Sequence, residues 1–363
     1  MSTDRVGSRD GSRLVALPPQ AERVPWPTAE WPTAPAPPGV DLSSLLEEAF
    51  DDEGPMARSF AVVVVHRGQL VAERYGGVLE HFDRPPDPVG PDSRLLSWSM
   101  AKSMLHAAIG LLVADGLVSL GEPAPVDGWA APRDPRRAIT LEHLLEMRDG
   151  LEFREDYVDA GASDVIEMLF GSGKDDVAAF AAARPPRVPP GERFSYSSGT
   201  SNIVAGILKE RVGRGPLLEE WLRERLFDPI GATSVELGFD ASGTWVASSF
   251  VHATARDYAR FGELYLRGGW WEGRRILPEG WVDHGRTPRS LDEDGSAYGA
   301  HWWVLDDLWG SFRAAGYEGQ SIVVSPGLDL VLVRLGKTPE ERSDALAAWT
   351  ARVLSAFAGP NGP

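Results

Sequence analysis

A serine and a lysine three residues apart, Ser99 and Lys102, stand at the start of a long apolar segment. Residues with this spacing share one face of a helix, so their side chains would be neighbours. A serine hydroxyl is a poor nucleophile until a base takes its proton, and burial lowers the pKa of a lysine until its amine can be that base. The pair predicts a serine that becomes acylated, with Lys102 as its activator. The alternative is a lysine whose ammonium group reaches solvent.

A tyrosine, Tyr196, lies in the polar stretch 194–199. A phenol beside an ammonium group is held as phenolate or shares its proton, so it can carry protons between the serine and a leaving group. We expect Tyr196 to be the general base and acid, with Ser198 facing the same cavity. A buried tyrosine bonded to a carbonyl is the commoner situation for such a residue alone, and the pairing with the serine and lysine favours catalysis.

The last pair of apolar segments is preceded by a glycine-rich stretch, Gly316-Tyr317-Glu318-Gly319-Gln320. Glycines let backbone approach a substrate, and an edge strand offers free N–H groups. We expect the amides of Ser99 and Gln320 to form an oxyanion hole, which is usually the largest single contribution to acyl transfer. The alternative is an ordinary glycine-rich entry into a strand.

Two pairs of apolar segments near the ends of the chain predict β-hairpins that would hold these residues. Their strands cover residues 60–66 and 70–75 at one end and 320–325 and 328–335 at the other, where a helix over about 339–358 follows. Between the hairpins, residues 100–117 are apolar nearly all round and end at Asp115-Gly116, which predicts a buried helix. Further helices are predicted over residues 141–148, capped by Thr140, and over 201–212 and 217–226.

These elements predict an α+β fold in which a mainly antiparallel sheet, built from both termini, is flanked by helices beside a mostly helical second domain. The expected α/β domain combines residues 41–140 and 245–363, and the helical domain covers 141–244. Residues 1–40 are proline-rich from residue 14 onward and cannot form a helix or a central strand. We expect an extended arm pinned by Trp26 and Trp31, with a disordered tail as the alternative.

The composition excludes several classes of function. A formal net charge of -17 over 363 residues disfavours binding to nucleic acid or to an anionic membrane surface. The chain has no cysteine, so disulfides and thiolate chemistry are excluded. No signal peptide or membrane-spanning run is recognised, and we expect a cytoplasmic protein. The seven histidines show no metal-ligand spacing, so no metal and no cofactor are expected.

Five motifs together resemble the serine β-lactamase-like superfamily. Within it, they are similar to class C β-lactamases and family VIII carboxylesterases, and above all to 6-aminohexanoate-dimer hydrolases. The region of resemblance runs from about residue 60 to about 335. The motifs are Ser99-Met-Ala-Lys102-Ser103, His143-Leu-Leu-Glu-Met-Arg-Asp-Gly150-Leu, Glu155-Asp-Tyr157-Val-Asp159, Tyr196-Ser-Ser-Gly199-Thr-Ser-Asn202 and Gly316-Tyr-Glu-Gly-Gln320.

The resemblance implies a cleft between an α/β domain and a helical domain, an acyl-enzyme intermediate and no metal. It implies that Tyr157 contacts a substrate amide; a loop tyrosine packed under an aromatic ring is the alternative. Penicillin-recognising members carry Lys-Thr-Gly where this chain has Tyr317, Glu318 and Gly319, which we expect to bind substrate. The cation that would hold a β-lactam carboxylate is missing, and Glu318 would repel that carboxylate.

The sequence therefore predicts a serine hydrolase that cleaves an ester or a small linear amide through an acyl-enzyme at Ser99. The alternatives are a β-lactamase, a D-amino-acid peptidase, or a binding module that kept the cleft without catalysis. We expect a small-molecule substrate, no nucleic-acid or membrane partner, and a monomer or homodimer.

Overall fold

Both ends of the chain contribute strands to one eight-stranded antiparallel sheet, with the order β10-β11-β12-β13-β14-β15-β1-β2. The computed structural model describes residues 14–80, 85–157, 159, 161 and 163–358. The strands of the sheet are β1 (Arg58–His66), β2 (Gln69–Tyr75), β10 (Ser290–Leu291), β11 (Ala297–Tyr298), β12 (Trp303–Val304), β13 (Phe312–Gly316), β14 (Gln320–Ser325) and β15 (Leu330–Lys337). Both predicted hairpins are confirmed, and β1 pairs with β15 to join the two ends.

The two faces of the sheet are covered by different helices. Alternation along β1 places Val63 in one apolar core and Val62 in another. The first core includes side chains of α2 (Ala101–Ala114) and α8 (Ala255–Leu266). The second includes side chains of α1 (Ser43–Ala49) and α10 (Ser343–Phe357). Because both faces are covered, β1 is buried along nearly all of its length.

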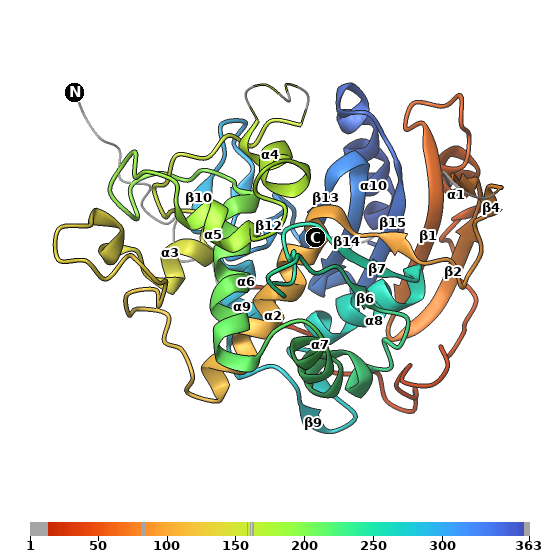
Figure 1. The fold of residues 1–363 in the computed structure, drawn as a ribbon. Helices are drawn as coiled ribbons and strands as arrows, with labels where there is room; N and C mark the ends of the chain where they lie inside the picture. Colours follow the sequence, from red (N-terminus) through yellow and green to blue (C-terminus); the bar gives the residue numbers. More distant parts are fainter. Residues whose placement is uncertain (1–13, 81–84, 158, 160, 162, 359–363) are drawn as a thin grey trace, which may run out of the picture.

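The regular elements in the middle of the chain are mostly helices, as predicted, and Figure 1 shows α3, α5 and α6 on the side away from β1 and β2. These helices, with their neighbours, are α3 (Leu141–Leu145), α4 (Asp164–Phe170), α5 (Val177–Ala182), α6 (Ser198–Val212), α7 (Pro216–Leu222) and α9 (Trp281–Arg286). Thr140 caps α3 as expected, but α3 ends earlier than residue 148, and α6 begins at Ser198 rather than 201 because Ser197 caps it. The domain boundaries themselves stay a prediction.

Several short strands have no counterpart in the sequence analysis. They are β3 (Val78–Leu79), β4 (Asp87–Pro88), β5 (Leu95–Leu96), β6 (Glu236–Leu237), β7 (Val251–Ala253), β8 (Trp270–Trp271) and β9 (Arg274–Arg275), together with β10, β11 and β12. Most contain two residues, which is too few for an alternating apolar pattern to be visible. Within the described ranges, no helix has both the length and the apolar character needed to span a bilayer.

The described part of the N-terminal arm lies against α8 and β2. Trp26 packs against Trp271 with ring centroids 5.0 Å apart, and the guanidinium of Arg260 lies 5.5 Å from the centre of the Trp31 ring. The amide of Leu70 on β2 donates to the Pro32 carbonyl at 2.8 Å. Both tryptophans thus pin the arm, as the sequence predicts.

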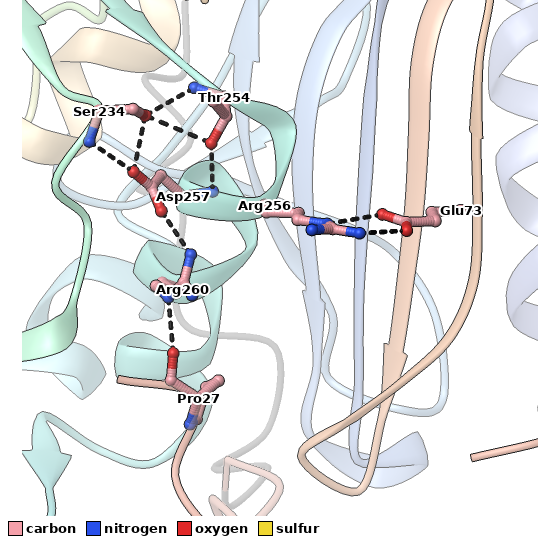
Figure 2. Close-up of polar contacts among 7 residues, drawn as sticks. All are labelled: Pro27, Glu73, Ser234, Thr254, Arg256, Asp257 and Arg260. Carbon is pink, nitrogen blue, oxygen red and sulfur yellow. Dashed lines mark hydrogen bonds and ion pairs between the residues drawn. The ribbon is translucent and has the colours of Figure 1, made fainter. Parts of the chain in front are cut away.

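Helix α8 connects the N-terminal arm to strand β2 and to the loop that contains Ser234 (Figure 2). Arg260 donates to the Pro27 carbonyl at 2.7 Å and to Asp257 at 2.5 Å, and Asp257 accepts two hydrogen bonds from Ser234. Arg256, one residue before Asp257, forms an ion pair with Glu73 on β2. The N-terminal half of α8 is therefore anchored by one buried ion pair and by one partly exposed ion pair.

A buried ion pair loses most when one partner is removed, because the other charge is left uncompensated. The side chains of Arg260 and Asp257 are only 9% and 4% exposed. We expect Arg260→Ala to lower the free energy of unfolding by about 3 kcal/mol in urea denaturation. As a control, Arg94→Ala removes the exposed pair with Glu236 and should change it by less than about 1 kcal/mol. Equal effects of the two substitutions would contradict the assignment.

Candidate active site

Ser99 lies in a short 3-10 turn, Trp98–Met100, that leads directly into α2. Trp98 has a φ of 46°, a left-handed conformation that is strained for a bulky residue and often marks a functional site. The residue before this turn is anchored to β7, since the Ser97 amide donates to the Val251 carbonyl at 2.8 Å. The hydroxyl of Tyr258 on α8 lies 3.1 Å from the same carbonyl. The α8 helix thus helps to place the nucleophile.

Lys102 is buried, with 2% of its surface exposed, and its amine faces three oxygen atoms. It donates to the hydroxyl of Ser99 at 2.9 Å, to the hydroxyl of Ser198 at 3.0 Å and to the carbonyl of Ser248 at 3.0 Å. Burial lowers the pKa of Lys102 to about 8, against the opposing effect of the Glu155 carboxylate. This burial excludes the alternative in which the ammonium group reaches solvent.

Tyr196 lies beside this pair. The Lys102 amine is 4.9 Å from the centre of the Tyr196 ring. Desolvation raises the pKa of Tyr196, so the resting group is a neutral phenol rather than a phenolate. The structure therefore brings the predicted nucleophile, lysine and tyrosine together, from segments almost a hundred residues apart.

A carboxylate that the sequence analysis did not single out, Glu155, completes the polar cluster. It accepts hydrogen bonds from the Ser198 amide at 2.8 Å, from the Ser198 hydroxyl at 2.5 Å and from the Tyr157 hydroxyl at 2.5 Å. A continuous chain of hydrogen bonds thus runs from Lys102 through Ser198 and Glu155 to Tyr157. The available signal was the spacing of Glu155 and Tyr157, which places both on one side of an extended segment.

Aromatic side chains surround the entrance to the cluster. Tyr317 contacts Trp98 edge-on with ring centroids 5.7 Å apart, and it contacts Tyr157 at 5.2 Å. Tyr157 and Tyr317 are 39% and 40% exposed, so both rings present an apolar surface to solvent. Glu318 follows in a left-handed conformation with a φ of 59°. These contacts place the predicted substrate residues Tyr157 and Tyr317 beside Trp98, the residue before Ser99.

The end of β13 packs directly on the backbone of the nucleophile. A Cβ atom built on Gly316 would lie 2.4 Å from the Ser97 carbonyl oxygen and 3.2 Å from the Ser99 amide nitrogen. Tyr317 follows Gly316 directly, whereas Gln320 lies across the hairpin from it and turns its side chain toward Gly336. Strand β14 pairs with both β13 and β15, so it is not the edge strand that the sequence analysis expects. The Gln320 amide stays a predicted oxyanion donor, and the Tyr317 amide is a second candidate.

Substituting Gly316 should damage the site without touching a polar group. A methyl group 2.4 Å from the Ser97 oxygen forces β13 away from the Ser99 backbone, and oxyanion donors act only at hydrogen-bond distance. We expect Gly316→Ala to reduce kcat/KM for a p-nitrophenyl ester by about 100-fold. The control is Gly121→Ala, where an added Cβ meets nothing within 4 Å. Unchanged kinetics for Gly316→Ala would show that this contact does not shape the site.

The histidines nearest the site have structural partners. The ring of His301 bonds to the Leu145 carbonyl at 2.9 Å and to the Ser201 hydroxyl at 2.9 Å. Its own carbonyl accepts from Ser103 of α2, so it links the two helices that carry the cluster. Burial lowers the pKa of His301 to about 3, which keeps the ring neutral. Among the residues that the structure describes, no group of His, Asp or Glu side chains is arranged to hold a metal ion.

Comparison with known proteins agrees with this arrangement. The chain is 27% identical over 330 residues to the 6-aminohexanoate-dimer hydrolase of Paenarthrobacter ureafaciens, covering 85% of this chain and 81% of that protein. A Bacillus anthracis protein described as a candidate 6-aminohexanoate-dimer hydrolase has a similar fold, with a TM-score of 0.73 and 23% identity over 91% of this chain and 89% of its own. A family VIII carboxylesterase superposes with a TM-score of 0.66 and 16% identity over 88% and 99% of the two chains.

The resemblance noted in the motifs extends well beyond them. The named relatives are described as hydrolases or as a carboxylesterase, and the two solved structures share the fold of this chain. The model of the beta-lactamase family matches residues 48–357, which include both hairpins and every residue of the polar cluster. This protein belongs to the beta-lactamase family.

Proposed function

We propose that this protein is a serine hydrolase that cleaves an ester or a small linear amide through an acyl-enzyme at Ser99. The observation that carries the proposal is the 2.9 Å contact between the Ser99 hydroxyl and the buried amine of Lys102. A charged lysine is costly to bury, and the pKa of about 8 leaves a usable fraction of neutral amine near neutral pH. Tyr196 beside the pair supports the same chemistry.

The contacts of Lys102 suit the neutral amine as a base. An ammonium group has three N–H donors, and loss of one proton leaves two donors and a lone pair. The two donors remain on the Ser198 hydroxyl and the Ser248 carbonyl, which directs the lone pair toward Ser99. The base is therefore oriented by its neighbours before the substrate arrives.

In acylation, the Ser99 oxygen bonds to the substrate carbonyl carbon while its proton passes to Lys102. The oxyanion of the tetrahedral intermediate accepts hydrogen bonds from the Ser99 amide and from the predicted Gln320 amide. The bond to the leaving group then breaks, and Tyr196 protonates the departing alcohol or amine, since its raised pKa keeps it protonated at rest. The Lys102 ammonium returns a proton to Tyr196.

In deacylation, water attacks the acyl carbon and gives its proton to the same base. The bond between the acyl carbon and the Ser99 oxygen breaks, and Ser99 recovers its proton as the carboxylic product leaves. No metal or cofactor is part of this proposal. A monomer or homodimer, a small-molecule substrate and a cytoplasmic location belong to the same proposal.

A panel of acyl donors tests the function. We expect a p-nitrophenyl ester or an aminohexanoate oligomer to be turned over and to leave a transient acyl adduct in the intact mass of the protein. A chromogenic cephalosporin should react poorly because Glu318 opposes its carboxylate. Rapid cleavage of the cephalosporin alone would favour a β-lactamase, and the absence of any adduct would favour a binding module.

Tyr157 decides between ester and amide substrates. Because its hydroxyl proton is donated to Glu155, its oxygen is free to accept a hydrogen bond from a substrate N–H group. An ester has no such N–H. We expect Tyr157→Phe to reduce kcat/KM for a linear amide by about 10- to 100-fold while ester hydrolysis changes less than about threefold, as measured on paired substrates of equal chain length. Equal losses on both would remove the reason to favour amides.

A further inference from the structure

Arg334, in the middle of β15, is a buried cation on which the Glu318 carboxylate acts only as a nearby charge, since no ion-pair contact with Arg334 is found among the described residues. It is 2% exposed, and among the described residues no Asp or Glu oxygen is recorded within ion-pair distance of it. Its partners are all neutral: it donates to the carbonyls of Arg58, Glu318 and Gly319 and to the hydroxyl of Ser59. An unpaired buried charge is strongly destabilising, and an apolar side chain would fill the same space at lower cost. The fold therefore retains this guanidinium for a reason other than stability.

Two of its four acceptors belong to the loop that follows Gly316. Arg334 donates from one nitrogen to the Glu318 and Gly319 carbonyls, each at 3.2 Å. The Glu318 carbonyl also accepts from the Thr338 amide at 2.9 Å, and the Tyr317 carbonyl accepts from the Gln320 side chain at 2.9 Å. Each carbonyl of residues 317–319 thus accepts a hydrogen bond from Gln320, Arg334 or Thr338.

The surroundings of the guanidinium are shaped to admit it. A Cβ atom on Gly319 would lie 2.9 Å from one terminal nitrogen of Arg334, and a Cβ on Gly336 would lie 2.5 Å from the other. Two glycines therefore leave the space that the planar group occupies. The loop itself is strained, because Glu318 has a φ of 59°, and such a conformation persists only where neighbouring contacts impose it. The hydrogen bonds from Arg334 are such contacts.

We propose that Arg334 is a positioning residue for the proposed hydrolysis: it holds the 317–320 loop so that backbone amides next to Ser99 keep the geometry that a tetrahedral oxyanion requires. The inference rests on the proposed function. Across a trans peptide, the carbonyl and the N–H of one unit point in opposite directions, so fixing the carbonyls also fixes the amides. A cation on the Gly319 carbonyl also polarises the peptide unit that contains the Gln320 N–H, which makes it a better donor.

The test compares Arg334→Met and Arg334→Lys with Arg267→Lys. Arg267 is also buried, but it forms ion pairs with Glu263 and Asp329. For each folded variant, kcat and KM are measured with a p-nitrophenyl ester, together with the affinity for an aryl boronic acid, whose adduct with a serine is tetrahedral and anionic. Arg334→Met should reduce kcat and boronic acid affinity in parallel by about 30- to 100-fold, with KM changed less than threefold.

Arg334→Lys keeps the charge but cannot span all four acceptors, so we expect it to lose about tenfold in kcat and in boronic acid affinity. Arg334→Lys still tests the proposal if Arg334→Met fails to fold. Arg267→Lys should lower the melting temperature without changing kcat. The inference is overturned when the parent hydrolyses the ester and Arg334→Lys matches Arg267→Lys in kcat and boronic acid affinity. The proposed function fails by a separate readout, namely the absence of any acyl adduct in the parent.

Discussion

Ser99→Ala should abolish turnover, with a loss of at least about 10⁴-fold in kcat for a p-nitrophenyl ester. The substitution removes the only atom that can form the acyl bond, while the amides around it still bind and polarise the substrate. The residual rate should therefore exceed that of water alone but show no burst of p-nitrophenol. Stoichiometric labelling by a fluorophosphonate, followed by intact mass, should also disappear.

Ser103→Ala is the matched control for this experiment. Ser103 is a buried serine on α2, close to the nucleophile in sequence, but its hydroxyl donates to the His301 carbonyl at 2.7 Å. We expect the control to lose about 1 kcal/mol of stability and to keep its labelling and most of its kcat. Undiminished labelling of Ser99→Ala would refute Ser99 as the nucleophile.

Lys102→Met should reduce kcat by about 10³-fold, because general-base assistance is lost while the apolar volume of the side chain is largely kept. The pH profile is the sharper measurement. The folded-state pKa of Lys102 is lowered from its ordinary value to about 8, so the amine is mostly protonated below pH 8 and neutral above it. In the parent, kcat/KM should rise tenfold per pH unit below this value and level off above it.

Lys102→Met should lack this limb of the pH profile, namely the tenfold rise of kcat/KM per pH unit below pH 8. Lys209→Met is the matched control, since Lys209 is also buried but donates to the Ser242 hydroxyl at 3.1 Å, far along α6 from Ser198. The control should keep both kcat and the limb near pH 8. A limb near pH 8 that persists in Lys102→Met would exclude Lys102 as the group whose titration controls the rate.

Local patterns were sufficient for much of the architecture. The segments that became β1 and α2 are apolar runs, so their composition and length identify them. The turn of the first hairpin was equally readable, since Arg67 and Gly68 both adopt positive φ as a two-residue hairpin turn requires. Strands of two residues, such as β10, were not predicted because so short a segment shows no periodic pattern.

The proposed catalytic pair could also be predicted from the local sequence. Ser99 and Lys102 are one helical turn apart, and any helix that begins near Ser99 places their side chains side by side. The hydrogen bond between them at 2.9 Å therefore follows from the spacing together with the apolar character of the segment. The predicted role of Tyr196 required a further assumption, because its proximity depends on the packing of α2 against α6.

What the tertiary structure alone decided is the environment of that pair. The Ser248 carbonyl that orients Lys102 and the Glu155 carboxylate that holds Ser198 and Tyr157 come from loops with no periodic pattern. Gly316 lets β13 approach the backbone before α2, and the Arg334 side chain binds carbonyls of another segment; no local pattern predicts either contact. Spacing along the chain determined which groups could react, because neighbours in a helix need no fold to meet. The polarity and geometry around them arise from contacts between segments far apart in sequence, and these exist only once the sheet and helices have packed.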